Sequence, residues 1–322
     1  MRLFAAILIL FISGCGGFLQ RDSVDITSFE PEAAQIVRDG LADKDPRVRT
    51  NTIEVVASAG LTGFMPEVQR LLRDNFVPVR FAAALAVGDT AYQPAKSDVE
   101  RLLGTGDENT RIAAAYALVK LGHPEKLDFI RKAVVSKDQV VRANAVVLLG
   151  KSGDESALKL LSFAQTDKDS DDKVKFQAVE SRARLGDEKV FPKLWAIVLS
   201  SYADDRIMGI RAMGALGTEK AKDVLATKLD DELPEVRLAA AEQLGALGDK
   251  RGEKEVLDVF KKNLTAGMDT QSVERINVLT SLAIGRICTP RLITFLPPLL
   301  KSESKSVRLA AAKAVFQCGT RK

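Results

Sequence analysis

A repeat of about 31 residues is the feature that most constrains how this chain can fold. A basic residue recurs at spacings of 31, 31, 31, 33, 31, 31, 38 and 33, namely at Arg49, Arg80, Arg111, Arg142, Lys175, Arg206, Arg237, Arg275 and Arg308. A glycine follows eleven residues later in most copies, and the exceptions carry Ala91 and Arg286. A fixed period of this length is typical of a solenoid, in which each unit buries its apolar surface against its neighbours.

Each unit is predicted to be a pair of helices. The first is an apolar segment at helical spacing, as in residues 67–72, 126–130 and 157–161. The second begins near the basic residue and ends at the glycine, which suits the left-handed position after a helix. Aspartates four residues before the basic residue are placed to cap this second helix: Asp45, Asp107, Asp138 and Asp171.

The second helices carry small residues where bulkier ones are usual. Three residues after the basic position lie Ala114, Ala145 and Gly209, among others. These small side chains are predicted to let the next pair approach closely, because overpacking costs about 1–3 kcal/mol per site. Nine units about 10 Å apart predict an arc of roughly 80–90 Å.

The combined pattern Asp-x-x-Val-Arg-x-x-Ala-x-x-x-Leu-Gly resembles the HEAT repeat, and in particular the short bacterial form named after phycobilisome lyases. The resemblance covers residues 31–322 and implies an all-α, right-handed α-solenoid of about nine helical hairpins, with the second helices lining its concave face. It also implies a structural ladder in which the basic residues bond to inter-helix aspartates and carbonyls. The ladder would comprise Arg49, Arg80, Arg111, Arg142, Lys175, Arg206, Arg237 and Arg308, with Lys175 the weakest rung because lysine lacks the guanidinium fork. A ligand-binding role for this basic column is the alternative.

The N-terminus reads as an export signal. Arg2 precedes an eleven-residue apolar run, which is too short to span a bilayer but has the length of a signal-peptide core. Ile12-Ser13-Gly14-Cys15 then resembles the bacterial lipobox, which implies cleavage after residue 14, acylation of Cys15, and a tether over residues 15–30. Gly16 stands where an aspartate would imply retention in the inner membrane, so the outer membrane is favoured. An ordinary secretory signal with a chance cysteine is the alternative.

Two further cysteines, Cys288 and Cys318, lie about one repeat apart. Stacked helices are about 8–10 Å apart, whereas a disulfide needs Cα atoms within about 7 Å. We therefore expect two unlinked, mostly buried thiols, although an exported compartment would permit a bridge.

Composition argues against several classes of function. The net charge of +4 is small for 322 residues and aromatics make up only 6%, which disfavours nucleic-acid binding. His123 is the sole histidine, so the multi-histidine sites of HEAT-type metal hydroxylases and Cys/His zinc sites are excluded. Because no nucleophile elbow or phosphate-binding loop is present, we expect no enzyme activity and no cofactor.

The candidate binding surface lies at the exposed end of the second helices. Nine residues after the basic position, three adjacent units carry Lys120, Lys151 and Arg184, and Tyr116 lies one turn before Lys120. A tyrosine beside cations suits contact with a protein or an anionic ligand, and a solvated charged face is the alternative.

Two stretches depart from the period. An insertion near residues 260–269 predicts a longer helix and a loop, with a functional loop as the alternative. The other carries Asp167, Asp169 and Asp171, but Asp172 and Ala178 occupy the positions where an EF-hand needs glycine and glutamate. An acidic solvated turn is expected, with cation binding left open.

These observations predict a lipid-anchored, non-catalytic interaction scaffold of the bacterial cell envelope. Its concave face would bind a protein partner, and no nucleic acid. The alternative, suggested by the resemblance to the lyases, is a lyase- or chaperone-like protein that grips a small ligand or a client protein.

Overall fold

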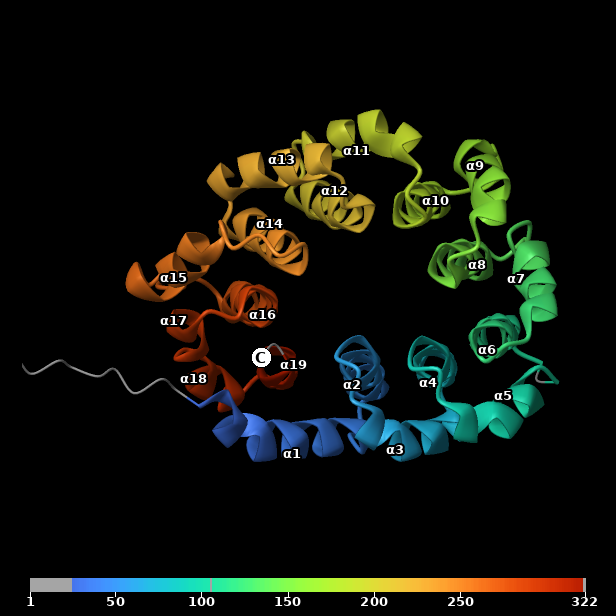
Figure 1. Cartoon of the computed structure of the whole chain (residues 1–322), viewed down its shortest axis with the longest axis horizontal. Helices are drawn as coiled ribbons and strands as arrows, with labels where there is room; N and C mark the ends of the chain where they lie inside the picture. The colour runs from blue at the N-terminus through green and yellow to red at the C-terminus, as the bar shows by residue number, and fades with distance from the viewer. Residues whose placement is uncertain (1–24, 105, 321–322) are drawn as a thin grey trace, which may run out of the picture.

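In the computed structural model, residues 25–104 and 106–320 are described, and they form an all-helical solenoid, as predicted. The first helices of the hairpins form an outer layer, joined by short 3-10 turns (Figure 1): α1 (Glu30–Leu41), α3 (Met65–Arg70), α5 (Lys96–Leu102), α7 (Leu127–Ala133), α9 (Leu158–Thr166), α11 (Phe191–Val198), α13 (Glu219–Thr227), α15 (Glu253–Lys261), α17 (Pro290–Ile293) and α18 (Leu296–Leu300). The second helices form an inner layer: α2 (Pro46–Ser58), α4 (Val77–Asp89), α6 (Glu108–Lys120), α8 (Gln139–Ser152), α10 (Asp172–Arg184), α12 (Ala203–Leu216), α14 (Pro234–Ala246), α16 (Thr270–Ile287) and α19 (Lys305–Gly319).

The inner helices begin and end where the sequence predicts. Asp45, Asp107, Asp138 and Asp171 are N-caps, and each carboxylate accepts a backbone N–H of the first turn. Gly153 has a φ of 80° after α8, a conformation that most side chains disfavour. Where the glycine is missing, Ala91 adopts a positive φ, and after the longer α16 Cys288 takes this role. The signal peptide, Cys15 and the first part of the tether lie outside the described residues.

The solenoid closes on itself, so the predicted open arc is wrong. The last helix, α19, packs against α16 on one side and against α1 and α2 on the other, and Figure 1 shows the resulting ring. Apolar residues from both ends of the chain share one hydrophobic cluster. Nine units that complete a turn rotate by about 40° each, a curvature that the repeat period does not specify.

The junction of α19 with α1 and α2 is called the seam here. The Lys305 ammonium lies 2.6 Å from Asp43 Oδ2, and the rings of Phe64 and Phe316 pack edge to face with centroids 6.4 Å apart. A Cβ on Gly40 would lie 2.3 Å from Thr52 Oγ1 in α2 and 3.2 Å from Leu309 Cδ2 in α19, so the small residue allows both helices to pack closely on α1. An ion pair, an aromatic contact and close helix packing therefore hold the ring closed.

The expectation of two unlinked thiols is also wrong. Cys288 and Cys318 form a disulfide with their Cα atoms 5.3 Å apart. The spacing argument assumed an ordinary distance between stacked helices. Gly285 makes the distance between α16 and α19 shorter than this, because a Cβ at that position would lie 2.8 Å from the Cα of Ala314 in α19. The two helices therefore approach closely where the cysteines lie.

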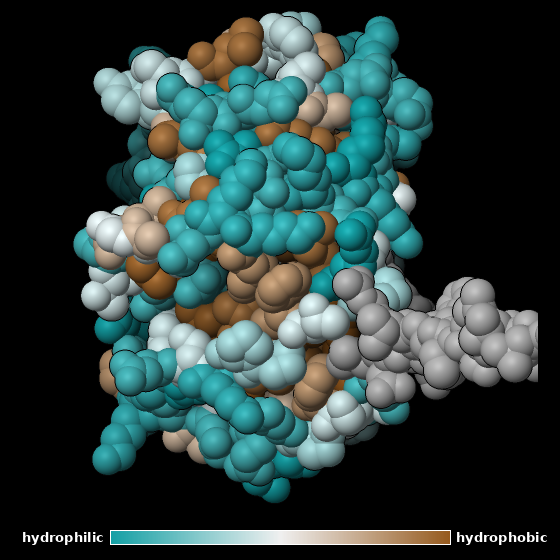
Figure 2. Space-filling model, turned by 90° about the vertical axis from the view of Figure 1, so that its left-hand side faces the viewer, coloured by the Kyte–Doolittle hydropathy of each residue, from teal (hydrophilic) through white to brown (hydrophobic). Residues whose placement is uncertain are grey.

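The insertion forms ordinary structure. It extends α16 to 18 residues and adds a connection in which Asn263 and Gly267 have positive φ. Phe260 stacks on Phe295 with ring centroids 4.1 Å apart, which anchors the connection to the outer layer. On this side the outer layer consists of the short α17 and α18, and Figure 2 shows apolar surface there among hydrophilic stretches. None of the helices in the described part is long and apolar enough to cross a bilayer.

Candidate functional site

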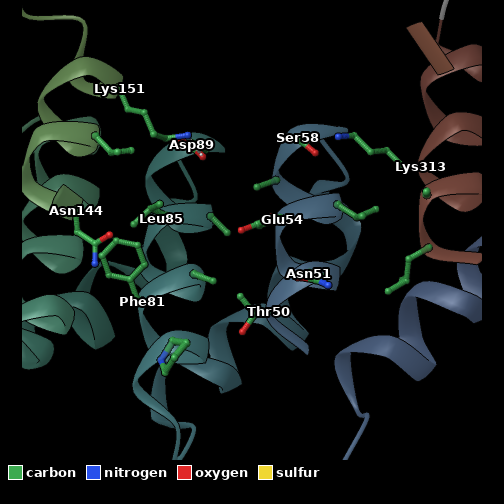
Figure 3. Close-up of a pocket in the computed structure, with 18 of the residues that line it drawn as sticks. Thr50, Asn51, Glu54, Ser58, Phe81, Leu85, Asp89, Asn144, Lys151 and Lys313 are labelled. Atoms are coloured by element: carbon green, nitrogen blue, oxygen red, sulfur yellow. Dashed lines mark hydrogen bonds and ion pairs between the residues drawn. The ribbon is translucent and has the colours of Figure 1, made fainter. Parts of the chain in front are cut away.

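Closure of the ring turns the concave face into a lumen. A cavity of about 880 Å³ lies inside it, lined by residues of α2, α4, α6, α8, α10, α16 and α19. A second hollow of about 820 Å³, bordered by α12 and α16, shares Val278 and Ser306 with it. Figure 3 shows that Asp89, Lys151 and Lys313 lie toward one end of the cavity, whereas Glu54 lies nearer its middle, level with Leu85. The cavity has the volume of a site for a small molecule or a short stretch of chain.

The prediction that Tyr116 contacts a partner is wrong. Its side chain is 1% exposed, because the ring packs on Gly88 of the neighbouring inner helix. A Cβ on Gly88 would lie 2.8 Å from Tyr116 Cε1, so only glycine leaves room for the ring. The Tyr116 hydroxyl donates to Asp89 Oδ1 at 2.6 Å, and burial together with this carboxylate raises the pKa of the phenol. Tyr116 therefore holds the lumen wall together.

The predicted basic stripe is divided by the structure. Lys151 and Arg184 line the cavity, but each faces a carboxylate: Lys151 Nζ lies 2.8 Å from Asp89 Oδ2, and Arg184 Nη2 lies 3.0 Å from Glu180 Oε1. Lys120 is exposed and is absent from the cavity lining. The lumen consequently presents paired charges of both signs, and the stripe does not act as a uniform basic surface.

Sequence reasoning missed the position that carries Glu54 and Lys313. Both lie five residues after the basic residue of their repeat. This is one helical turn before the position, nine residues after the basic residue, that carries Lys151 and Arg184. Both line the cavity, and in Figure 3 Glu54 points from α2 toward α4 while Lys313 reaches from α19 toward Ser58. The period could have revealed this position, because the same count gives Glu54, Leu85, Tyr116, Val147, Glu180, Arg211, Glu242, Thr280 and Lys313.

The surroundings of Glu54 and Lys313 disfavour their charged forms. Water reaches Glu54, but protein surrounds it inside the ring, and this burial raises the pKa of its carboxyl against the pull of Lys313 and Lys151. Burial likewise lowers the pKa of Lys313, opposed by the negative charge of Glu242. Shifts of opposite sign on an acid and a base in one cavity are typical of a functional site.

The basic ladder is positioned away from the lumen, in the turns between helices. Arg49 makes a bidentate contact with Asp74 at 2.9 and 3.0 Å, and its Nη1 donates to the carbonyl of Asp43. Arg142 and Arg206 each contact a carboxylate 25 residues further on, at 2.9 Å. Each of these arginines thus ties its own turn to the turn of the next repeat.

The remaining ladder positions vary in strength. Arg80 Nη2 lies 3.7 Å from Asp107, Arg237 Nε lies 3.2 Å from Glu255, and Arg308 donates to the carbonyls of Ser302 and Glu303. Arg111 and Lys175 occupy the equivalent places in their repeats, and the Lys175 side chain has no hydrogen bond or ion pair within the described ranges. Arg275 departs from the pattern by pairing with Asp204 of α12.

The acidic turn and the histidine have structural partners. Asp167 accepts from Arg142, Asp171 caps α10, and Gln139 bonds to the backbone of Asp169 and Asp171. His123 lies beside Glu125 in the turn after α6, with Nδ1 3.4 Å from Oε1. In residues 25–104 and 106–320, no group of three His, Cys, Asp or Glu side chains could hold a metal ion.

The chain matches the family model for HEAT repeats. Three overlapping matches cover residues 66–147, 133–210 and 198–273, which together make up more than half of the chain. No curated protein matches it.

Several solved structures are similar to this chain at low sequence identity, with TM-scores below 0.5. Human deoxyhypusine hydroxylase in complex with glycerol is 16% identical, with a TM-score of 0.39, over 82% of this chain and 98% of that one. The complex of CpcE and CpcF of phycocyanin lyase from Nostoc sp. PCC7120 is 17% identical, with a TM-score of 0.46, over 78% and 94%. Kap121p is 14% identical, with a TM-score of 0.36, over 87% and 37%. These similarities concern the fold.

Proposed function

The chain belongs to the HEAT-repeat family, and from its closed ring we propose that it is a non-catalytic binding protein of the bacterial cell envelope that captures an extended segment of a protein partner in its lumen. One observation carries this proposal. Because α19 packs on α1 and α2, the concave face is enclosed within the ring, and its hollows of about 880 and 820 Å³ are each far smaller than a folded domain. An extended chain is therefore the form of protein partner that fits. Binding of a folded partner across a broad concave surface, as an open solenoid allows, does not apply.

The absence of catalysis is proposed from the chemistry of the lumen. The polar groups of the lining are amides, hydroxyls, carboxylates, ammonium groups and one guanidinium, and the sole histidine, His123, lies in a turn between helices and outside the cavity lining. The hydroxyl-bearing residues of the lining are Thr50, Ser58 and Ser306. A hydroxyl nucleophile needs an adjacent general base to become reactive, whereas the Thr50 hydroxyl donates to the Pro46 carbonyl and neither serine hydroxyl is hydrogen-bonded to a carboxylate or an amine among the described residues.

The envelope location is proposed from two independent features. The residues around Cys15 resemble a lipobox, and Gly16 favours the outer membrane. The Cys288–Cys318 disulfide is of the kind that persists in oxidising compartments such as the periplasm. Replacing Cys15 with serine should move the protein from the detergent phase to the aqueous phase in a Triton X-114 partition. If the variant stays in the detergent phase, the lipid anchor is contradicted.

The partner-binding proposal can be tested by site-specific crosslinking in intact cells. A photo-crosslinking amino acid at Asn51, which lines the cavity from α2, should yield an adduct with a defined envelope protein. The same amino acid at Lys132, exposed on the outer helix α7, is the matched control and should yield none. Adducts from Lys132 alone, or from neither position, would contradict the lumen as the binding surface.

The volume of the cavity also favours a second candidate, a protein that grips a small ligand. Sites for small molecules have volumes of about 300–1,000 Å³, and this cavity lies within that range. Native mass spectrometry of protein purified from its own cells distinguishes the two. A stoichiometric bound small molecule favours the second candidate, whereas an Asn51 adduct with an envelope protein favours the first.

A further inference from the structure

Glu54 and Lys313 are brought together only by the closing of the ring. Each lies five residues after the basic residue of its repeat, Glu54 in the first unit and Lys313 in the last. Their helices, α2 and α19, meet at the seam, and both side chains line the same cavity. In Figure 3 Lys313 reaches from α19 toward α2, and Glu54 points from α2 toward α4.

These two charges differ from their neighbours because they are unpaired within the described part of the chain. Lys151 and Arg184 have carboxylate partners at 2.8 and 3.0 Å, whereas neither Glu54 nor Lys313 has a hydrogen bond or ion pair, with the other or with a third residue. They are close enough to influence each other electrostatically. Glu54 is exposed in the lumen and Lys313 is half-buried, so each can pair with an incoming group of opposite charge.

The rest of the cavity is suited to apolar groups. Phe81 and Leu85 project from α4, with Leu85 level with Glu54, and further apolar side chains come from α8, α16 and α19: Val140, Val147, Val278, Leu282 and Leu309. Most of the lining area is therefore hydrocarbon, with Glu54 beside it and Lys313 nearer one end of the cavity. Such a site takes an apolar ligand whose polar ends are fixed by a few placed groups.

Resting on the proposed capture of an extended segment in the lumen, we propose that the occupant is a peptide with one cationic and one anionic group flanking apolar residues. The cationic group is held by Glu54 and the anionic group by Lys313, while the apolar side chains lie against Phe81, Leu85 and Leu309. A free amino terminus or a lysine side chain supplies the cation, and a free carboxyl terminus or an acidic side chain supplies the anion. Because the two sites lie on either side of the seam, binding also draws α2 and α19 together.

Three peptides distinguish these sources when their affinities are measured by isothermal titration calorimetry on the full chain. The first is trileucine with free termini, the second is the same peptide acetylated and amidated, and the third is an acetylated and amidated Lys-Leu-Leu-Asp. Binding of the first or third at least tenfold tighter than that of the neutral second peptide is expected. Tight binding of the first peptide alone identifies the chain termini as the source of the recognised charges. Tight binding of the third peptide alone identifies side chains as that source.

Two variants assign the charges to residues. Glu54→Gln should remove the penalty for acetylating the amino terminus of trileucine while keeping the penalty for amidating its carboxyl terminus. Lys313→Met should remove the penalty for amidating the carboxyl terminus and keep the penalty for acetylating the amino terminus. Lys120→Met is the matched control, because Lys120 is an exposed inner-helix lysine outside the cavity lining, and it should leave all affinities unchanged. Thermal melts check that each variant folds.

Three results would overturn this assignment. The first is equal affinity for the neutral and the charged peptides, and the second is no binding of any of the three peptides. The third is an equal loss of affinity for all three peptides in Glu54→Gln and Lys313→Met variants that are shown to be folded. If one of these occurs while Asn51 still yields an adduct with an envelope protein, the lumen remains the binding surface and the charge recognition alone fails. If Asn51 also yields no adduct, the proposed function fails with it.

Discussion

The Cys288–Cys318 disulfide joins α16 to the helix that closes the ring. Cys318 lies in the last turn of α19, and α19 contacts both α16 and the first hairpin. Reduction, or replacement of both cysteines by serine, should therefore make it easier for α19 to detach from α16 and from the first hairpin. The bond acts mainly by restricting the unfolded chain, so its loss lowers the free energy of unfolding without requiring a change in the folded ring.

The size of the effect follows from the loop that the bond closes. The cysteines are 30 residues apart in the sequence. Chain entropy for a loop of this length corresponds to about 3.5 kcal/mol at 25 °C. In a chain of this size 1 kcal/mol shifts the thermal midpoint by about 1.5 °C, so we expect a decrease of about 5 °C.

The assay compares three samples: the oxidised protein, the same protein in reductant, and the double variant Cys288→Ser with Cys318→Ser. Reductant should lower the midpoint of the parent to that of the variant and leave the variant unchanged. Hydrogen exchange should increase first in α19 and in the helices that it touches across the seam, α1 and α2. Midpoints within about 1 °C of each other, or exchange that rises evenly around the ring, would refute this reasoning.

Three further predictions test the packing, the ladder and the lumen. Ala114→Leu or Ala145→Leu should destabilise by about 1–3 kcal/mol, because both positions are fully buried, and a urea midpoint equal to that of the parent would place them outside a helix contact. Asp231→Asn should cost about 3 kcal/mol in urea unfolding, because it removes the carboxylate from the buried Arg206, and a change below about 1 kcal/mol would contradict the ladder. Glu54→Gln should raise the thermal midpoint at pH 7, because the pKa of Glu54 is raised in the folded protein and its charge is therefore unfavourable to folding above that pKa. The gain should vanish below pH 4, where the Glu54 carboxyl of the parent is neutral in both the folded and the unfolded protein.

The hairpins were predictable because their signals are local. The cap at Asp138 and the glycine at 153 are fixed by hydrogen bonds and backbone preferences within a few residues. The ladder arginine at position 206 reaches a carboxylate 25 residues away, still within one period of the repeat. Any feature that repeats with the period can be counted from the sequence alone.

The candidate site was only partly predictable, because it depends on which face of each helix points inward. The count of nine residues found Lys151 and Arg184, but it also selected Lys120, which lies outside the cavity lining. Glu54 and Lys313 occupy the earlier turn of the same helices and could have been counted in the same way. Their placement in one cavity could not be predicted, because it depends on the seam. There the first and last repeats are in contact although the contacting residues lie more than 250 positions apart in the sequence.

Closure of the ring determines what the protein can bind, and it depends on a small angle. Nine units close when each rotates by about 40°, and a decrease of about 5° per unit would leave a gap of about 45° between the two ends. That angle arises from side-chain volumes at the helix contacts, where Gly88, Gly285 and Gly40 allow neighbouring helices to approach. An open form of the same solenoid would offer a broad concave surface to a folded partner. The closed form offers a narrow cavity with Glu54 and Lys313 on either side of the seam, so in the proposed binding mode the recognition of a chain by its charges and the integrity of the ring are parts of one equilibrium.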